Sequence, residues 1–148
     1  MTESTIAPKA APHLRAHARR LEGLRHEIVI GDGRHVLFTD EPAALGGDDS
    51  APAPHELLPA ALAACISTTL AAYARTRDWP IGDVAVDVDY DHRSTPRRFT
   101  VAIHLGRELS PEQVARLEKV AAACPVRRAI EAGMTFDEHV VLDAVSVA

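Results

Sequence analysis

Two cysteines are the residues of this sequence best suited to chemistry. Cys65 lies among alanines in the longest apolar run of the chain, and Cys124 directly precedes Pro125. Free cysteine packs well as a small core residue, so both side chains could be purely structural. The alternative is a redox pair, in which one thiolate attacks an oxidant and the second thiol closes a disulfide.

A redox role requires that one thiol be a thiolate at neutral pH. The pKa of a free cysteine is near ~8.5, so the attacking thiol needs a cation or a helix N-terminus beside it. Cys65 lies far from the start of its own helix. The cation must therefore come from another segment, and arginine is the natural candidate because it stays charged when buried.

The apolar run around Cys65 predicts a long helix over residues 54–75. Leu58, Leu62, Cys65 and Thr69 recur at helical spacing, and the intervening alanines leave no wide polar stripe, so most of the helix circumference should be covered. Its length suits a membrane span, but Glu56 and the charged residues after the run favour a soluble core helix over one in a membrane.

Composition indicates one globular domain spanning 1–148, with a loose N-terminal arm over 1–14. The chain has 148 residues, of which 47% are hydrophobic and 25% charged, enough for a real core. A net charge of -5 and an aromatic content of 4% argue against nucleic acid as a partner. The sequence opens without a secretory leader pattern, so we expect a cytoplasmic protein with reduced thiols.

The remaining segments predict an α+β fold with antiparallel pairing. A hairpin is expected around Gly31-Asp32-Gly33, and a capping box from Ser110 to Gln113 starts a helix that Cys124-Pro125 interrupts. The expected strands cover residues 17–21, 24–30, 34–39, 84–90, 99–105 and 135–142. A loop is expected over 41–54, and a last short helix over 126–132 that stops at Gly133. Strands, helix, strands, helices and strand in this order are typical of α+β rather than of repeated βαβ units.

Several of these segments, taken together, resemble one family. They are Gly46-Gly47, then Pro54-x-Glu56-Leu57-Leu58 followed by Ala60-Ala61-Leu62-Ala63-Ala64-Cys65, then Trp79-Pro80, then Cys124-Pro125-Val126-Arg127-Arg128. The set, in this order and spacing, resembles the OsmC/Ohr family of thiol-dependent peroxidases over roughly residues 15–143. The resemblance implies an intertwined homodimer, with antiparallel sheets wrapped around long central helices.

The resemblance also implies an activity. Cys65 would be the peroxidatic cysteine and Cys124 the resolving one in a two-cysteine cycle that reduces organic hydroperoxides and serves defence against oxidative stress. An external thiol or dithiol would reduce the disulfide, and no metal or flavin cofactor is required. Apolar residues around Cys65 would suit an organic hydroperoxide.

Two further residues enter as candidates through the same resemblance. Family peroxidases pair a glutamate after the helix-start proline with an arginine of the N-terminal hairpin; here His55 takes that glutamate position and Glu56 follows one residue later. One residue turns a helical side chain by about 100°. Arg25 is the best match for the arginine. Exposed charges without function are the alternative for both Glu56 and Arg25.

Other chemistries are less well supported by the sequence. No C-x-x-C pair occurs, and we predict no metal site. His55 would lie on roughly the opposite side of the helix from Cys65, so it cannot act as its base within one helix. Asp87, Asp89 and Asp91 alternate with valines as a solvent-facing strand surface would. A dimeric OsmC-like scaffold for a hydrophobic ligand, or a redox sensor with little turnover, remains the alternative function.

Overall fold

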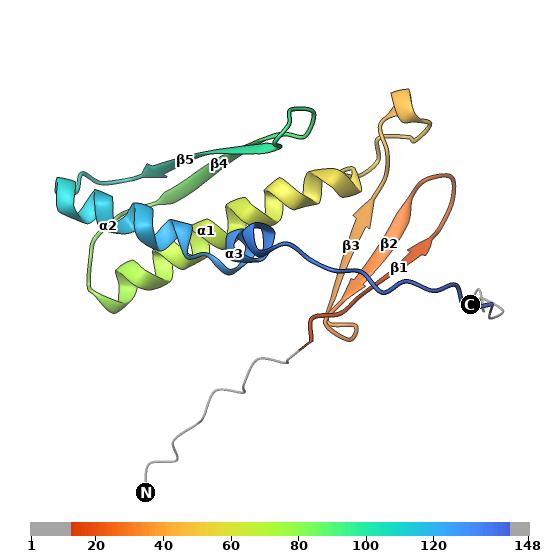
Figure 1. The fold of residues 1–148 in the computed structure, drawn as a ribbon, viewed down its shortest axis with the longest axis horizontal. Helices are drawn as coiled ribbons and strands as arrows, with labels where there is room; N and C mark the ends of the chain where they lie inside the picture. The colour runs from red at the N-terminus through yellow and green to blue at the C-terminus, as the bar shows by residue number, and fades with distance from the viewer. Residues whose placement is uncertain (1–12, 143–148) are drawn as a thin grey trace, which may run out of the picture. The chain divides into compact units, whose positions relative to one another are not determined.

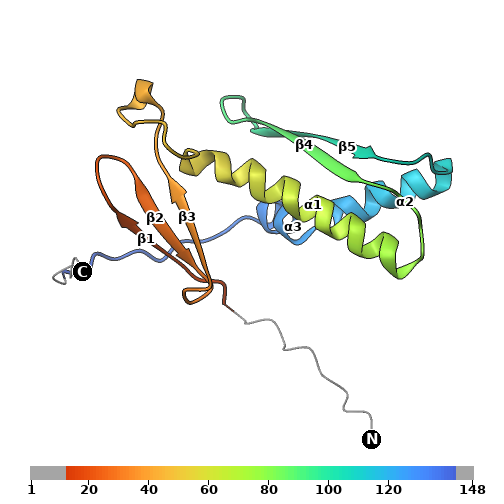
Figure 2. The same ribbon diagram turned by 180° about the vertical axis from the view of Figure 1, so that it is seen from behind.

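The computed structural model describes residues 13–142, which divide after Leu58 into two compact units (Figures 1 and 2). The arm expected over 1–14 lies outside the described residues except for His13 and Leu14, which are both exposed. The expectation of a single domain stays a prediction. The α+β class with antiparallel pairing is confirmed.

The first unit is built on a three-stranded antiparallel sheet in the order β1-β2-β3. Its strands are β1 (Ala16–Arg20), β2 (His26–Ile30) and β3 (His35–Thr39), as the sequence predicted. Ile30 pairs with Ala16 on one side and with His35 on the other. The turn between β2 and β3 has positive φ at three of its four residues, 64° at Gly31, 57° at Asp32 and 92° at Gly33, which glycine and aspartate tolerate better than most residues.

The loop predicted after β3 contains a short 3-10 turn, η1 (Ala43–Leu45), and a second one, η2 (Pro54–Glu56), leads into the long helix. That helix, α1 (Leu57–Thr76), runs from the end of the first unit into the second. Its position confirms the predicted central helix, with the proline-containing start forming the 3-10 turn rather than regular α-helix.

The second unit places an antiparallel hairpin along the helices (Figures 1 and 2). Its elements after α1 are β4 (Val84–Asp91), β5 (Arg98–Leu105), α2 (Pro111–Ala122) and α3 (Pro125–Ala132). Alternate residues of β4, such as Val86 and Val88, face the core, as the sequence alternation predicted. The buried core is made of Leu62, Ile66, Leu70, Ala74, Ile81, Leu117, Ala121 and Cys124.

The predicted helix ends are confirmed atom by atom. The Gln113 amide N–H donates to Ser110 Oγ at 3.2 Å, and the Ser110 N–H donates to Gln113 Oε1 at 3.0 Å. Cys124 is the N-cap of α3, and Pro125 takes the first helical position. The backbone N–H that proline lacks would have no partner within the helix at that position. Gly133, with φ at 73°, ends α3.

The strand predicted over 135–142 is wrong. Residues 133–142 contain no strand, and their large apolar side chains are exposed, Phe136 at 78% and Leu142 at 94%. Alternation of apolar and polar residues marks a segment that could join a sheet, but a strand forms only where a sheet edge accepts its backbone hydrogen bonds. In the described part of the chain no strand pairs with this segment.

The second unit by itself covers one side of α1, so the expectation that most of the helix circumference is covered stays a prediction. One face of the helix is exposed along its length, at Ala64, Thr68, Ala71, Ala72 and Arg75. The buried residues of the helix all lie on the opposite side, toward the hairpin, α2 and α3. Within the part of the chain that the structure describes, the core of the second unit covers that side of the helix.

The close turn at Gly47 gives a test of the first unit. The Gly47 N–H donates to the Pro42 carbonyl, and a Cβ at position 47 would overlap the Glu41 carbonyl, which is backbone and cannot move aside cheaply. We expect Gly47→Ala to lower the free energy of unfolding by about 1–3 kcal/mol, as overpacking does. Urea denaturation of the two proteins measures the difference. Equal midpoints would show that the loop around Gly47 is looser than described.

Candidate thiol site

The fold brings Cys65 and Cys124 together in the second unit. Cys65 comes from the middle of α1 and is half-buried, while Cys124, at the N-cap of α3, is 0% exposed. Cys65 packs against the core cluster to which Cys124 belongs. Cys65 lies near enough to influence the ionisation of Cys124, and both are free thiols. Two segments far apart in the sequence thus place two reduced sulfur atoms side by side.

The two cysteines have unequal environments. Burial raises the pKa of the Cys124 thiol, and its interaction with Cys65 raises it further. The Arg127 amide N–H, which donates to Cys124 Sγ at 3.4 Å, acts in the opposite direction without overcoming burial. Cys124 is therefore a protonated, enclosed thiol at neutral pH. Cys65, the more exposed of the pair, is the sulfur that a small molecule reaches first.

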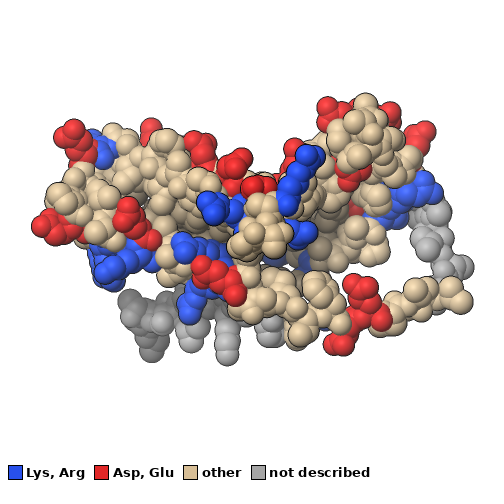
Figure 3. All heavy atoms as spheres, turned by 45° about the horizontal axis from the view of Figure 1, so that its top comes forward, with Lys and Arg blue, Asp and Glu red and all other residues tan. Residues whose placement is uncertain are grey.

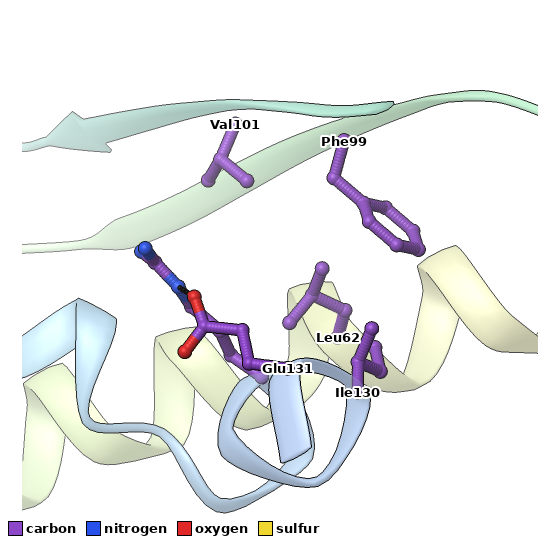
Figure 4. A pocket seen from close by; sticks show the side chains of 6 residues that line it. Leu62, Phe99, Val101, Ile130 and Glu131 are labelled. Carbon is purple, nitrogen blue, oxygen red and sulfur yellow. Dashed lines mark hydrogen bonds and ion pairs between the residues drawn. The ribbon is translucent and has the colours of Figure 1, made fainter. Parts of the chain in front are cut away.

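A cavity of about 340 Å³ opens between α1, β5 and α3 (Figure 4). Leu62 stands about one turn before Cys65 on α1, and Arg127 stands in the first turn of α3 after Cys124. The remaining lining residues are Phe99 and Val101 of β5 and Ile130 and Glu131 of α3. Arg127 Nε donates to Glu131 Oε1 at 2.9 Å, so the charged groups of the lining pair with each other. The volume suits a small organic molecule.

Arg25, the predicted activating arginine, is held within the first unit. Its Nη1 donates to Ser50 Oγ at 2.7 Å, and its guanidinium lies 4.7 Å from the centre of the Phe38 ring. Ser50 Oγ in turn donates to Asp40 Oδ2 at 2.7 Å. Arg25 is therefore fixed by specific partners and is not a loosely held surface charge. Its catalytic role stays a prediction.

Glu56, the predicted partner of Arg25, is used locally. Its Oε2 accepts a hydrogen bond from the Ala53 amide N–H at 2.9 Å, which caps the 3-10 turn before α1. Glu56 is exposed. Within this unit, then, the two charged groups are bound to different partners, Arg25 to Ser50 and Glu56 to Ala53.

Asp40 and Ser50 are the residues that sequence reasoning missed. Asp40 is 1% exposed, although aspartate is rarely buried. Its only signal in the sequence is its place at the end of a strand, and Ser50 stands in a polar loop where a serine attracts no notice. The distance of ten positions between them is a loop closure that no local pattern encodes.

The buried carboxyl of Asp40 makes the stability of the first unit depend on pH. Hydrogen bonds from the Ser50 hydroxyl, and then from the Ser50, Glu41 and Asp48 N–H groups, lower the pKa of Asp40 to about 2. Below about pH 4 the Asp40 carboxyl is protonated in the unfolded chain but stays ionised in the folded one. Acidification therefore favours unfolding.

We therefore expect the stability of the wild type to fall as the pH drops from about 4 to about 2, and Asp40→Asn to lose this component. Urea denaturation between pH 2 and pH 6 measures it. Parallel pH profiles for the two proteins would contradict the assignment.

A metal-binding arrangement of side chains needs several ligands close together. Within residues 13–142, no three His, Cys, Asp or Glu side chains gather as ligands would. His13 and His17 are spaced as i and i+4, but His17 lies in strand β1, so the pair is not presented on one helix face. On the side of the molecule drawn in Figure 3, basic and acidic side chains are interspersed.

These features define an α+β protein whose long helix carries a cysteine beside a second, buried one. A family model described as OsmC-like protein matches residues 47–139, and the chain belongs to that family. The match covers Gly47, the start of α1, both cysteines and α3, which are the segments on which the resemblance was based. No match was found among curated proteins.

Solved structures share the fold. A protein of Psychrobacter arcticus 273-4, named for osmotic stress induction and a detoxification response, is 25% identical, with a TM-score of 0.66 over 76% of this chain and 85% of its own. The organic hydroperoxide resistance protein OsmC of Legionella pneumophila, also described as a predicted redox protein, is 26% identical, with a TM-score of 0.60 over 82% and 91%. A protein of Vibrio cholerae O1 biovar eltor named for organic hydroperoxide resistance is 22% identical, with a TM-score of 0.59 over 84% and 88%, and shows the fold alone.

The segment Pro54–Thr76 has the length and composition of a membrane-crossing helix, with a mean hydropathy of 1.6. Core helices of soluble proteins meet the same criterion. Only 22% of its most apolar window is buried in the chain, because one face of α1 is open.

Proposed function

We propose that this protein is a thiol peroxidase that reduces organic hydroperoxides with Cys65 and Cys124. The observation that carries the proposal is the contact between an accessible cysteine and an enclosed, protonated one. The family includes organic hydroperoxide resistance proteins, which supports the same chemistry.

The proposed cycle has three steps. The Cys65 thiolate attacks one oxygen of the hydroperoxide, the O–O bond breaks, and the leaving alkoxide takes a proton to become an alcohol. Cys65 is then a sulfenic acid. The Cys124 thiol attacks the Cys65 sulfur, water leaves, and a disulfide forms. An external dithiol, in a reducing compartment such as the cytoplasm, restores both thiols by exchange and is itself oxidised.

The cavity supports an organic rather than a hydrophilic substrate. Leu62, Phe99, Val101 and Ile130 offer apolar surface in the cavity, and the charges of Arg127 and Glu131 are paired with each other. An alkyl or aryl group of the hydroperoxide would be removed from water there, which lowers the free energy of binding by about 25 cal/mol per Å² buried.

In this proposal Arg25 supplies the cation that stabilises the Cys65 thiolate, and Glu56 assists its orientation. The resemblance supports both roles. The Arg25 guanidinium donates a hydrogen bond to Ser50 and stacks on Phe38, which is consistent with a positioned group. Glu56 already binds the Ala53 N–H through one of its oxygens, so its contribution is the smaller of the two.

A steady-state assay tests the function. Purified protein with a dithiol is given cumene hydroperoxide or hydrogen peroxide, and consumption of each is followed. We expect kcat/KM to be at least about tenfold higher for the cumyl compound, because its ring is buried. Oxidation without repeated turnover would instead favour the redox sensor, and two unreacted thiols would favour the scaffold.

The exposed face of α1 supports a homodimer. Ala64, Thr68, Ala71 and Ala72 form an exposed surface of small side chains along the helix, which a second copy of the chain would cover. We expect a dimer at micromolar concentration by sedimentation velocity, and a shift toward monomer in Ala64→Glu. Ala85→Glu, on the outer side of β4, is the control. A monomeric wild type would contradict the dimer and leave the thiol chemistry standing.

A further inference from the structure

A buried carboxylate reaches the Arg25 guanidinium through one hydroxyl group in the first unit. Asp40 Oδ2 accepts from Ser50 Oγ at 2.7 Å, and Ser50 Oγ accepts from Arg25 Nη1 at 2.7 Å. The other oxygen of Asp40 accepts the Glu41 N–H at 2.8 Å, and Oδ2 also accepts the N–H groups of Asp48 at 3.3 Å and Ser50 at 3.1 Å. We call the chain Asp40-Ser50-Arg25 the relay.

The direction of the relay is fixed by the groups themselves. A guanidinium only donates, and a carboxylate only accepts, so the single hydroxyl proton of Ser50 goes to Asp40 and a lone pair faces Arg25. The negative charge of Asp40 polarises that hydroxyl, which makes it a better acceptor for Arg25. The two interactions therefore strengthen each other.

Ser50, which lies between Asp40 and Arg25, has a second effect. A carboxylate bound directly to Arg25 would neutralise the charge that a thiolate needs. Here the Asp40 charge is kept one residue away and is shared among three backbone N–H groups and the Ser50 hydroxyl. The Phe38 ring, 4.7 Å from the guanidinium, fixes its plane and leaves its charge intact. The arrangement orients the Arg25 guanidinium without neutralising its positive charge.

We propose that Asp40, acting through Ser50, is a positioning residue for the Arg25 guanidinium in the thiol reaction. The inference rests on the proposed function, in which Arg25 stabilises the Cys65 thiolate. The same carboxylate also binds the backbone of the 48–50 segment. It therefore couples the shape of the loop to the orientation of the arginine.

Alkylation of Cys65 by iodoacetamide tests the relay without peroxide turnover. The second-order rate constant is measured from pH 5 to pH 10, with mass spectrometry to confirm the site. We expect Ser50→Ala to lower the rate at pH 7 by about fivefold, the scale of one hydrogen bond, and to move the rate profile to higher pH. Arg25→Ala should lower it at least as much. The double variant should be no slower than Arg25→Ala, because both changes break one chain.

Two further variants separate positioning from general loosening. Ser50→Thr keeps the hydroxyl and should restore the wild-type profile. Ser94→Ala removes a serine hydroxyl that donates to the Pro96 carbonyl in the β4–β5 turn, and should leave the profile unchanged. Thermal melts identify any variant that fails to fold; Asp40→Asn is read only if it melts cooperatively.

The outcomes distinguish this inference from the proposed function. If Arg25→Ala moves the profile while Ser50→Ala and Ser50→Thr both match wild type, the relay is overturned and the activating arginine stands. If Arg25→Ala also matches wild type, the relay is overturned together with the role of Arg25. Peroxidase activity that depends on Cys65 would survive either result.

Discussion

Replacing Cys65 by serine is expected to lower hydroperoxide turnover by at least about a thousandfold. A serine hydroxyl is almost never ionised at neutral pH, and no base is proposed that would activate it against an O–O bond. The substitution changes one atom in a half-buried position on α1, so the fold should be retained. The measurement is the initial rate of cumene hydroperoxide consumption with a dithiol present.

Two controls accompany this variant: its fold, and its loss of reaction with iodoacetamide at position 65. Far-ultraviolet circular dichroism and the thermal midpoint should match the wild type, and iodoacetamide should no longer modify position 65. Residual turnover within about tenfold of the wild type would mean that Cys65 is not the attacking atom, since loss of a nucleophile normally removes most of the rate.

Replacing Cys124 by alanine should leave the first step intact and stop the second. One equivalent of hydroperoxide is consumed per Cys65, and the sulfenic acid then waits for an external thiol. We expect dithiol-driven turnover to fall by about a hundredfold, and the stalled sulfenic acid to be oxidised further to sulfinic acid at excess peroxide. Burst kinetics and trapping of the sulfenic acid with dimedone measure the two effects.

Alanine is chosen at this position because Cys124 is fully buried, where a serine hydroxyl would need a partner. The change also removes the sulfur that accepts the Arg127 N–H, so a loss of about 0.5–2 kcal/mol in stability is expected from the lost cap. Val120→Ala, a truncation of a residue packed against the same core, controls for that loss. Unchanged dithiol turnover in Cys124→Ala would exclude a resolving role.

The local structure was largely predictable because short-range rules determine it. The Ser110 capping box, the turn at Gly31-Asp32-Gly33 and the break at Pro125 each depend on neighbouring residues, and each is present as expected. The strand over 135–142 was wrong for the opposite reason. Pairing depends on a sheet edge elsewhere, and the alternation of the segment carries no information about whether that edge is available.

The candidate site likewise has parts that could be predicted from the sequence and parts that could not. The resemblance singled out Cys65 and Cys124, whose contact the fold supplies. The Asp40 carboxylate could not be predicted, because its hydrogen bonds join a strand end to a loop eight to ten residues later. The cavity beside Leu62 is equally a product of packing, since its walls come from α1, β5 and α3.

The measurement that tests the account most directly is peptide mapping by mass spectrometry after one equivalent of cumene hydroperoxide. The reduced protein is oxidised without added thiol, alkylated under denaturing conditions and digested. The account predicts a single intramolecular disulfide between Cys65 and Cys124, absent in both cysteine variants and removed by a dithiol. Two alkylated, unoxidised cysteines after exposure to hydroperoxide would contradict it.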